Sequence, residues 1–275
     1  MRSRANLRRV TPKDADIVYG PVCSRRLGIS LGVNINLRRG KTCTFDCVYC
    51  QYGRTANHIS SPHALSDWAA EEVILTEVEA RLEDTRRKNQ RLDSITFSGY
   101  GETTLFPRLR GLILGVKGLR DRYCPGVPVR VLTNSSLICL GEVFEALKEF
   151  DSVIAKLDVG EQKAFQAINR PAEGIPTLGE IVEGLARLHK ANGRLVLQTL
   201  IFDSLIPGKP HNSDPGTLDS LIEGIRRIDP LETQIYTIAR YPSEPYAVPV
   251  GIDELHRVAS LINEKMGREC ARVYA

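Results

Sequence analysis

The sequence predicts an α/β fold built on parallel strands. Six apolar, β-rich runs alternate along the 275 residues with amphipathic helical patterns, and polar motifs follow directly after most of those runs. Such alternation favours parallel strands joined by right-handed crossovers. Six units are too few for a closed eight-stranded barrel, so the pattern fits either an open, partial β/α barrel or a doubly wound sheet. Both architectures place functional groups at the carboxyl ends of their strands.

The elements follow one another in a regular order. The expected strands are Gly28–Leu37, Ser94–Ser98, Val129–Thr133, Ser152–Leu157, Arg194–Phe202 and Glu232–Ile238. The expected helices are Ser66–Asn89, with Ser66 as N-cap, Phe106–Arg122, Gly141–Phe150, Thr177–Ala191, Thr217–Ile228 and Asp253–Lys265. Residues 240–249 are too rich in proline for a helix. Residues 206–212 are predicted to form a loop that could act as a lid.

Composition sets the class of protein. Hydrophobic residues make up 42% and charged residues 25% of the chain, as in ordinary globular proteins. No apolar stretch approaches the roughly 20 residues of a membrane-spanning helix. The basic N-terminus runs into Thr11-Pro12-Lys13-Asp14 and does not have the pattern of a secretory signal. Seven cysteines, an odd number, do not suit a disulfide framework. We therefore expect a cytoplasmic protein.

Positive charge is concentrated near the N-terminus. Residues 1–41 contain ten Lys and Arg against Asp14 and Asp16, a net charge of +8, whereas the whole chain carries +4. A basic arm of this kind can follow the phosphates of a nucleic acid. A solvated terminus without a partner is the equally weighted alternative.

The strongest chemical signal is the cysteine loop, residues 43–50, in which Cys43, Cys47 and Cys50 have the spacing Cys-x3-Cys-x2-Cys. Three thiolates within eight residues can converge on one soft metal centre. Iron–sulfur clusters usually take four cysteines. With three, one iron keeps an open coordination position for a substrate or cofactor, as catalytic zinc sites do.

Structural zinc is the competing interpretation of this loop, with Cys23 or Cys124 as a fourth ligand. Zinc ribbons and fingers generally pair two Cys-x2-Cys or Cys/His knuckles. The sequence has no second knuckle. The spacing therefore favours an iron–sulfur cluster.

The cysteine loop, with Tyr49 directly before its last cysteine, resembles the signature of the radical S-adenosylmethionine (SAM) superfamily. Residues 24–34, 51–55 and 168–171 narrow the resemblance to proteins related to the wyosine tRNA-modifying synthases. This resemblance implies a partial (β/α)6 TIM-like barrel, the radical SAM core, over residues 28–240. A basic extension at 1–27 would precede it, and a proline-rich segment with a helix, 241–275, would pack on it.

The resemblance also implies cofactors. A 4Fe–4S cluster would be held by Cys43, Cys47 and Cys50, and its fourth iron would bind the amino and carboxylate groups of S-adenosyl-L-methionine. One electron passed to the sulfonium would release methionine and a 5′-deoxyadenosyl radical that abstracts hydrogen from substrate. An external one-electron donor of flavodoxin or ferredoxin type is the implied partner.

Further cofactor-binding residues are expected at strand ends. The predicted set is Tyr49, Tyr100, Gly101, Glu102, Asn134, Ser135, Lys156, Asp158 and Gln198. Tyr100-Gly101-Glu102 resembles the superfamily's Gly-Gly-Glu element, which holds the methionine amino group, with Tyr100 in place of a glycine. Asn134 and Ser135 resemble positions near the methionine end of the cofactor.

Other polar residues on the strands leave two interpretations open. Lys156 and Asp158 share one strand face, where charges need a ligand or a partner, so they contact the cofactor or form an internal ion pair. Gln198 interrupts an apolar run and binds either cofactor or a neighbouring backbone group. Tyr236 flanks the adenine or packs in the core.

Four arginines, Arg25, Arg26, Arg54 and Arg170, lie close to predicted strand ends. They favour an anionic substrate such as a nucleotide or tRNA, or they stabilise the fold by ion pairs. Neither a flavodoxin-like pattern nor a second cysteine cluster accompanies the loop, which argues against wyosine formation itself. The alternatives are a peptide- or protein-modifying radical SAM maturase and a non-catalytic iron–sulfur or zinc protein.

Overall fold

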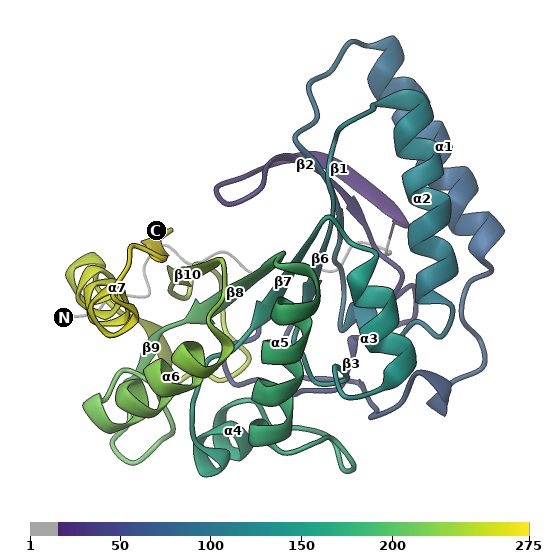
Figure 1. Ribbon diagram of the computed structural model, residues 1–275. Coiled ribbons are helices and arrows are strands. Elements are labelled where there is room, and N and C mark those ends of the chain that lie inside the picture. Colours follow the sequence, from purple (N-terminus) through teal and green to yellow (C-terminus); the bar gives the residue numbers. More distant parts are fainter. Residues whose placement is uncertain (1–15, 275) are drawn as a thin grey trace.

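A central eight-stranded sheet organises the computed structural model, which describes residues 16–274 (Figure 1). Its strand order is β1-β2-β5-β6-β7-β8-β10-β12. The six predicted strands are all present and parallel: β2 (Gly28–Val33), β5 (Ser94–Phe97), β6 (Val129–Thr133), β7 (Ser152–Lys156), β8 (Leu195–Leu200) and β10 (Glu232–Tyr236). These six strands neighbour one another in chain order, without the reversal of a doubly wound sheet. This order confirms the α/β prediction and favours the partial barrel.

Two edge strands were not predicted. β1 (Val18–Ser24) pairs antiparallel with β2, and β12 (Ala271–Val273) runs parallel to β10. Within the described residues β10 does not pair with β2, so the sheet stays open. β1 lies inside the stretch expected to be only a basic extension, and Gly20-Pro21 interrupts its strand pattern.

Part of the predicted basic arm cannot be placed. Five of its basic residues lie outside the described residues: Arg2, Arg4, Arg8, Arg9 and Lys13. The arm and the three-part division of the chain therefore stay predictions.

The six predicted helices form one layer, in which each packs on the next (Figure 1). They are α1 (Glu71–Arg87), α2 (Leu109–Tyr123), α3 (Gly141–Lys148), α5 (Leu178–Asn192), α6 (Pro215–Ile228) and α7 (Ile252–Met266). A capping box of Thr177 and Glu180 starts α5. The short α4 (Gln162–Ile168) was not predicted, nor were the 3₁₀ turns η1 (Pro62–Ala64) and η2 (Thr103–Leu105).

One helix start was wrong. Ser66 does not cap α1, which begins at Glu71 after Ala70. The preceding residues are held elsewhere, since Asp67 forms an ion pair with Arg38 and the Trp68 ring packs edge-on against Phe106. These tertiary contacts outweigh the local capping preference of Ser66.

The two faces of the sheet differ in chemistry. Register places Ile95, Val131 and Leu197 on one face, which is buried under the helices. The opposite face carries Thr96, Arg130, Ser152, Lys156, Gln198 and Gln234. Because side chains alternate along each strand, one face builds the core and the other is left for polar groups.

Two small ladders lie beyond the strand ends. β3 (Thr42–Cys43) pairs with β4 (Asn57–His58), and β9 (Phe202–Ser204) pairs with β11 (Ala247–Pro249). Among the described residues, no helix has both the length and the apolar character needed to cross a membrane.

Candidate functional site

The cysteine loop begins in β3 and is fixed by backbone hydrogen bonds to the segment that follows α4. The amides of Asp46 and Val48 donate to the carbonyls of Arg170 (3.1 Å) and Ile168 (3.0 Å), and the Ala172 amide donates to Thr44 (2.9 Å). This strand-like pairing explains why the Asn169-Arg170-Pro171 motif accompanies the cysteines, although more than a hundred residues separate them.

The three cysteines are unpaired thiols that are largely withdrawn from solvent. Cys43 and Cys47 are each 8% exposed, and Cys50 is half-buried. Burial raises the pKa of the Cys43 thiol to about 12 and that of the Cys47 thiol to about 11. Metal binding must therefore displace protons from these sulfurs, as thiolate ligation always does.

Side-chain amides donate to two of the sulfurs. The Asn134 side-chain amide donates to the Cys43 sulfur (3.5 Å), and the Asn169 side-chain amide donates to the Cys47 sulfur (3.6 Å). The Lys41 ammonium donates to the Gly53 carbonyl just beyond Cys50 and lies within electrostatic range of all three sulfurs. Hydrogen bonds of this kind stabilise thiolates and tune iron–sulfur clusters, so the donor set fits such a group.

A mononuclear zinc site does not fit this geometry. Cys23 pairs with Ile29 near the amino end of β2, and Cys124 caps the carboxyl end of α2, so both lie at the end of the sheet opposite the cysteine loop. In residues 16–274 no three His, Cys, Asp or Glu side chains lie together closely enough to hold a metal ion. Thiolates of a cubane cluster bind three different irons and need not converge on one point, as zinc ligands must.

The predicted Tyr100-Gly101-Glu102 element pairs with the start of the cysteine loop. The Thr42 amide donates to the Tyr100 carbonyl (3.3 Å), and the Glu102 amide donates to the Thr42 carbonyl (3.0 Å). Gly101 has a φ of 145°, and a Cβ there would lie 1.7 Å from the Thr42 carbonyl oxygen. Only glycine permits this close approach.

Glu102 is a buried carboxylate, 2% exposed, that accepts four hydrogen bonds. Its Oε1 accepts from the Thr104 amide, the Thr104 hydroxyl and the Thr133 hydroxyl, and its Oε2 accepts from the Asn134 amide (2.7 Å). Burial raises the pKa of Glu102, and these hydrogen bonds oppose that shift. Oε2 keeps capacity for one further donor.

Asn134 and Ser135 connect the end of β6 to its surroundings in different ways. The side-chain amide of Asn134 donates to the Thr44 hydroxyl (2.7 Å) as well as to the Cys43 sulfur, so this side chain contacts the cysteine loop twice. Ser135 has a positive φ of 72°, and its buried hydroxyl donates to the Lys156 carbonyl (3.0 Å). Asn134 is therefore directed at the loop, whereas Ser135 braces the neighbouring strand.

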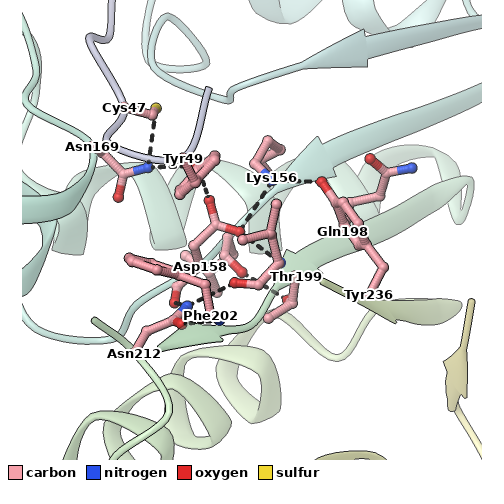
Figure 2. Close-up of polar contacts among 12 residues, drawn as sticks. Cys47, Tyr49, Lys156, Asp158, Asn169, Gln198, Thr199, Phe202, Asn212 and Tyr236 are labelled. Atoms are coloured by element: carbon pink, nitrogen blue, oxygen red, sulfur yellow. Dashed lines mark hydrogen bonds and ion pairs between the residues drawn. The ribbon is translucent and has the colours of Figure 1, made fainter. Parts of the chain in front are cut away.

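Tyr49, Lys156 and Asp158 form one buried network (Figure 2). The Tyr49 hydroxyl donates to the Asp158 carboxylate, which also accepts from the Leu200 amide (2.8 Å). Lys156 pairs with Asp158 (3.1 Å) and donates to the Tyr236 hydroxyl (2.8 Å). The internal ion pair that the strand pattern allowed is therefore present, and cofactor contact by these residues stays a prediction.

Charge in this network is balanced within the protein. Burial alone would lower the pKa of Lys156, but the Asp158 carboxylate and the Tyr236 hydroxyl outweigh it and raise that pKa. Burial and the same carboxylate raise the pKa of Tyr49 well above its usual value. Lys156 thus stays charged and Tyr49 stays a hydrogen-bond donor.

Gln198 and Tyr236 lie beside this network. The Gln198 side-chain amide donates to the side-chain carbonyl of Gln234 (3.0 Å) on the next strand and not to the backbone group expected as the alternative, and cofactor contact by Gln198 stays a prediction. The Tyr236 ring lies under the guanidinium of Arg26, 4.2 Å from its centroid. Arg26 is in the β1–β2 turn, so this contact connects the two sides of the open sheet.

Arg54 and Arg170 are engaged in ion pairs. Both bond Glu244, at 2.5 Å and 2.6 Å, and Arg54 also bonds Asp46 (2.8 Å) next to Cys47. This geometry favours the fold-stabilising interpretation of these two arginines. With the 206–212 loop they line a cleft of about 710 Å³. The lid role of that loop stays a prediction.

Two residues of the site were not among those predicted to bind cluster or cofactor. Lys41 immediately precedes β3 and is 3% exposed, and Asn169 contacts both Cys47 and Tyr49. In the sequence, Lys41 entered only as one of the basic residues near the N-terminus, and Asn169 only as part of the family motif at residues 168–171. A lysine two residues before a buried cysteine is a signal that could have been weighed.

Comparison with known proteins bears on this site. A family model described as the radical SAM superfamily matches residues 37–219. A UPF0026 protein of Methanocaldococcus jannaschii is 34% identical over 256 residues, which are 92% of this chain and 73% of the relative. A UPF0026 protein of Helicobacter pylori is 30% identical over 240 residues, 87% of this chain and 71% of the relative.

Solved structures agree in fold. A radical SAM methyltransferase from Sphaerobacter thermophilus is similar with a TM-score of 0.64 at 15% identity, over 89% of this chain and 65% of that one. Archaeal TYW1 is similar with a TM-score of 0.52 at 15% identity, over 86% and 72%. This chain spans less than two thirds of the methyltransferase chain. On the match over most of its length and the three-cysteine loop at the strand ends, the chain belongs to the radical SAM superfamily and is a radical SAM enzyme.

Proposed function

We propose that this chain holds a 4Fe–4S cluster on Cys43, Cys47 and Cys50 and uses it to cleave SAM reductively, acting on a nucleoside or tRNA-type substrate. The observation that carries the proposal is a loop of three withdrawn thiols in which side-chain amides donate to the sulfurs of Cys43 and Cys47, and the Lys41 ammonium lies beside Cys50 at the Gly53 carbonyl. Cluster and SAM together supply a 5′-deoxyadenosyl radical for hydrogen abstraction. An external one-electron donor of flavodoxin or ferredoxin type would provide the electron.

The chain's own residues would position the cofactor. Glu102 keeps one acceptor site on Oε2, which suits the ammonium group of a bound methionine moiety. Asn134 and Asn169 would hold the cluster ligands by donating to their sulfurs. The hydrogen bond from the Tyr49 hydroxyl to Asp158 would hold the Tyr49 ring in one orientation next to the cluster ligand Cys50.

Two features support an anionic substrate. Arg130 lies on the polar face of the sheet, half-buried, and within the described residues it has no ion-pair partner. Arg26 lies over the Tyr236 ring at the carboxyl end of β10. Guanidinium groups that lack a direct ion-pair partner can recognise phosphate or carboxylate. The segments 24–34, 51–55 and 168–171, which resemble the wyosine tRNA-modifying synthases, point to the same substrate class.

Anaerobic reconstitution with iron and sulfide tests the chemistry. After reduction with dithionite, the wild-type protein should release 5′-deoxyadenosine from SAM, and Cys47→Ala should release none because a cluster ligand is lost. Product no higher in the wild type than in Cys47→Ala would leave a non-catalytic metal protein as the better description.

The substrate class needs its own test. Nucleosides from total tRNA of a deletion strain should lack one modified nucleoside that the intact gene restores. Binding of bulk tRNA should weaken as salt increases, and an Arg130→Gln variant should show a shallower salt dependence. An unchanged nucleoside profile, together with equal salt slopes, would favour a peptide substrate.

A further inference from the structure

Lys41 is a buried lysine whose side chain bridges the two ends of the cysteine loop. It precedes Thr42 and Cys43, and its Nζ donates to the carbonyl of Gly53 (3.3 Å), just beyond Cys50. Its own carbonyl accepts from the amides of Ala56 and Asn57, both at 3.0 Å, so the backbone is fixed. The residue is 3% exposed.

The charge on Lys41 has no carboxylate to balance it. Among the described residues no Asp or Glu oxygen lies within ion-pair distance of Nζ, and Asp46, which exerts a longer-range influence, is bonded to Arg54. Lysines are almost never fully buried unless paired. The ammonium instead lies at the Gly53 carbonyl, whose own amide donates to the Cys50 carbonyl (3.2 Å), and it is within electrostatic range of all three sulfurs.

Lys41 brings a positive charge close to the sulfurs, whereas Asn134 and Asn169 donate to Cys43 and Cys47 from neutral amides. A cluster ligated by three thiolates carries net negative charge, and the electron that activates it adds more. A fixed positive charge beside the sulfurs favours the reduced form and so raises the reduction potential.

We propose that the Lys41 ammonium is the built-in counter-charge of the cysteine loop, a positioning residue that stabilises the reduced cluster and makes its one-electron reduction easier. This inference rests on the proposed function, since it needs a cluster on the three cysteines. It requires no contact between Lys41 and SAM or substrate.

A neutral variant, Lys41→Met, separates charge from side-chain length, and Lys41→Arg keeps the charge. Lys190→Met, on the exposed face of α5, is the matched control. The proteins are reconstituted without SAM and titrated with titanium(III) citrate while the spin signal of the reduced cluster is recorded. We expect the midpoint potential of Lys41→Met to be more negative than that of the wild type, with the other two variants close to wild type.

A second measurement distinguishes counter-charge from scaffold. Without cluster, the ammonium is a buried charge with no carboxylate, so Lys41→Met should unfold at the same or a higher temperature than the wild type. A purely structural lysine would lower the unfolding temperature instead, and that result overturns the proposal. An unchanged midpoint potential in a fully loaded Lys41→Met overturns it as well.

Loss of cluster binding is also decisive. If Lys41→Met is folded but takes up no cluster while Lys41→Arg does, the counter-charge role is supported. If Lys41→Arg fails equally, charge is not the relevant property and the proposal is wrong. A wild-type protein that takes up no cluster would instead refute the proposed function itself.

Discussion

Two lysines beside the cysteine loop, Lys156 and Lys41, are both withdrawn from solvent, but their charges are balanced in different ways. Lys156 pairs with Asp158 and bonds Tyr236, so its charge is compensated by the protein itself. Lys41 donates to a backbone carbonyl and has the three sulfurs within electrostatic range, with no carboxylate within ion-pair distance among the described residues. The charge of Lys156 is therefore balanced within the polypeptide, whereas the charge of Lys41 would be balanced by a negatively charged group bound at the cysteine loop.

The largest effect on stability is expected from Asp158→Asn, which leaves Lys156 without its counter-charge. Breaking a buried pair costs about 3–5 kcal/mol, and we expect about 3 kcal/mol because part of the Lys156 side chain meets solvent. Urea unfolding of the cluster-free protein measures this loss. Asp219→Asn, on the exposed face of α6, is the control. A loss no greater than that of the control would mean that Lys156 does not depend on Asp158.

A smaller effect should follow from Asn169→Leu. This change removes the neutral donor to Cys47 and a donor to Tyr49, but no charge. Because hydrogen bonds to cluster sulfurs raise the potential, we expect a midpoint shift in the same direction as Lys41→Met and smaller in size. The same redox titration reports it. A shift exceeding that of Lys41→Met would show that the amides, and not the charge, dominate the potential.

The smallest effect is expected at a half-buried carboxylate far from the loop, Asp151, which pairs with Lys117 (2.9 Å) and Arg120 (3.2 Å). Burial alone would raise the pKa of Asp151, but the hydrogen bond from the Val129 amide and the Lys117 ammonium outweigh burial and lower that pKa. The stability that Asp151 contributes is therefore complete above the unfolded pKa of about 3.9 and is lost as the pH falls through the lower folded value. Asp151→Asn should cost about 0.5–1 kcal/mol at neutral pH.

Denaturant titrations of this variant at several pH values check the sign. The difference from wild type should shrink below pH of about 4 and continue to fall as the pH drops through the lowered folded-state pKa of Asp151. If the stability difference persists at low pH, it comes from packing or from the Val129 hydrogen bond and not from the charge of Asp151.

Local patterns in the sequence predicted much of this protein. The alternation of apolar runs and amphipathic segments located the six parallel strands and the six long helices. The spacing of Cys43, Cys47 and Cys50 indicated the chemistry before any geometry was known, because ligands within eight residues are brought together by the chain itself. The ends of the helices and strands were predicted less accurately, as the wrong N-cap at Ser66 illustrates.

Contacts between distant segments had to come from the tertiary structure. The sequence puts Lys41 two residues before Cys43, but it does not indicate that the ammonium is buried at the Gly53 carbonyl without a carboxylate partner. Asn169 likewise reaches Cys47 only because residues 168–172 pair with the loop. The edge strand β1 likewise exists because β2 offers it an antiparallel partner. Periodicity and spacing are local properties of a chain, whereas the burial of a charge and the partners of a sulfur depend on which distant residues the fold brings beside them.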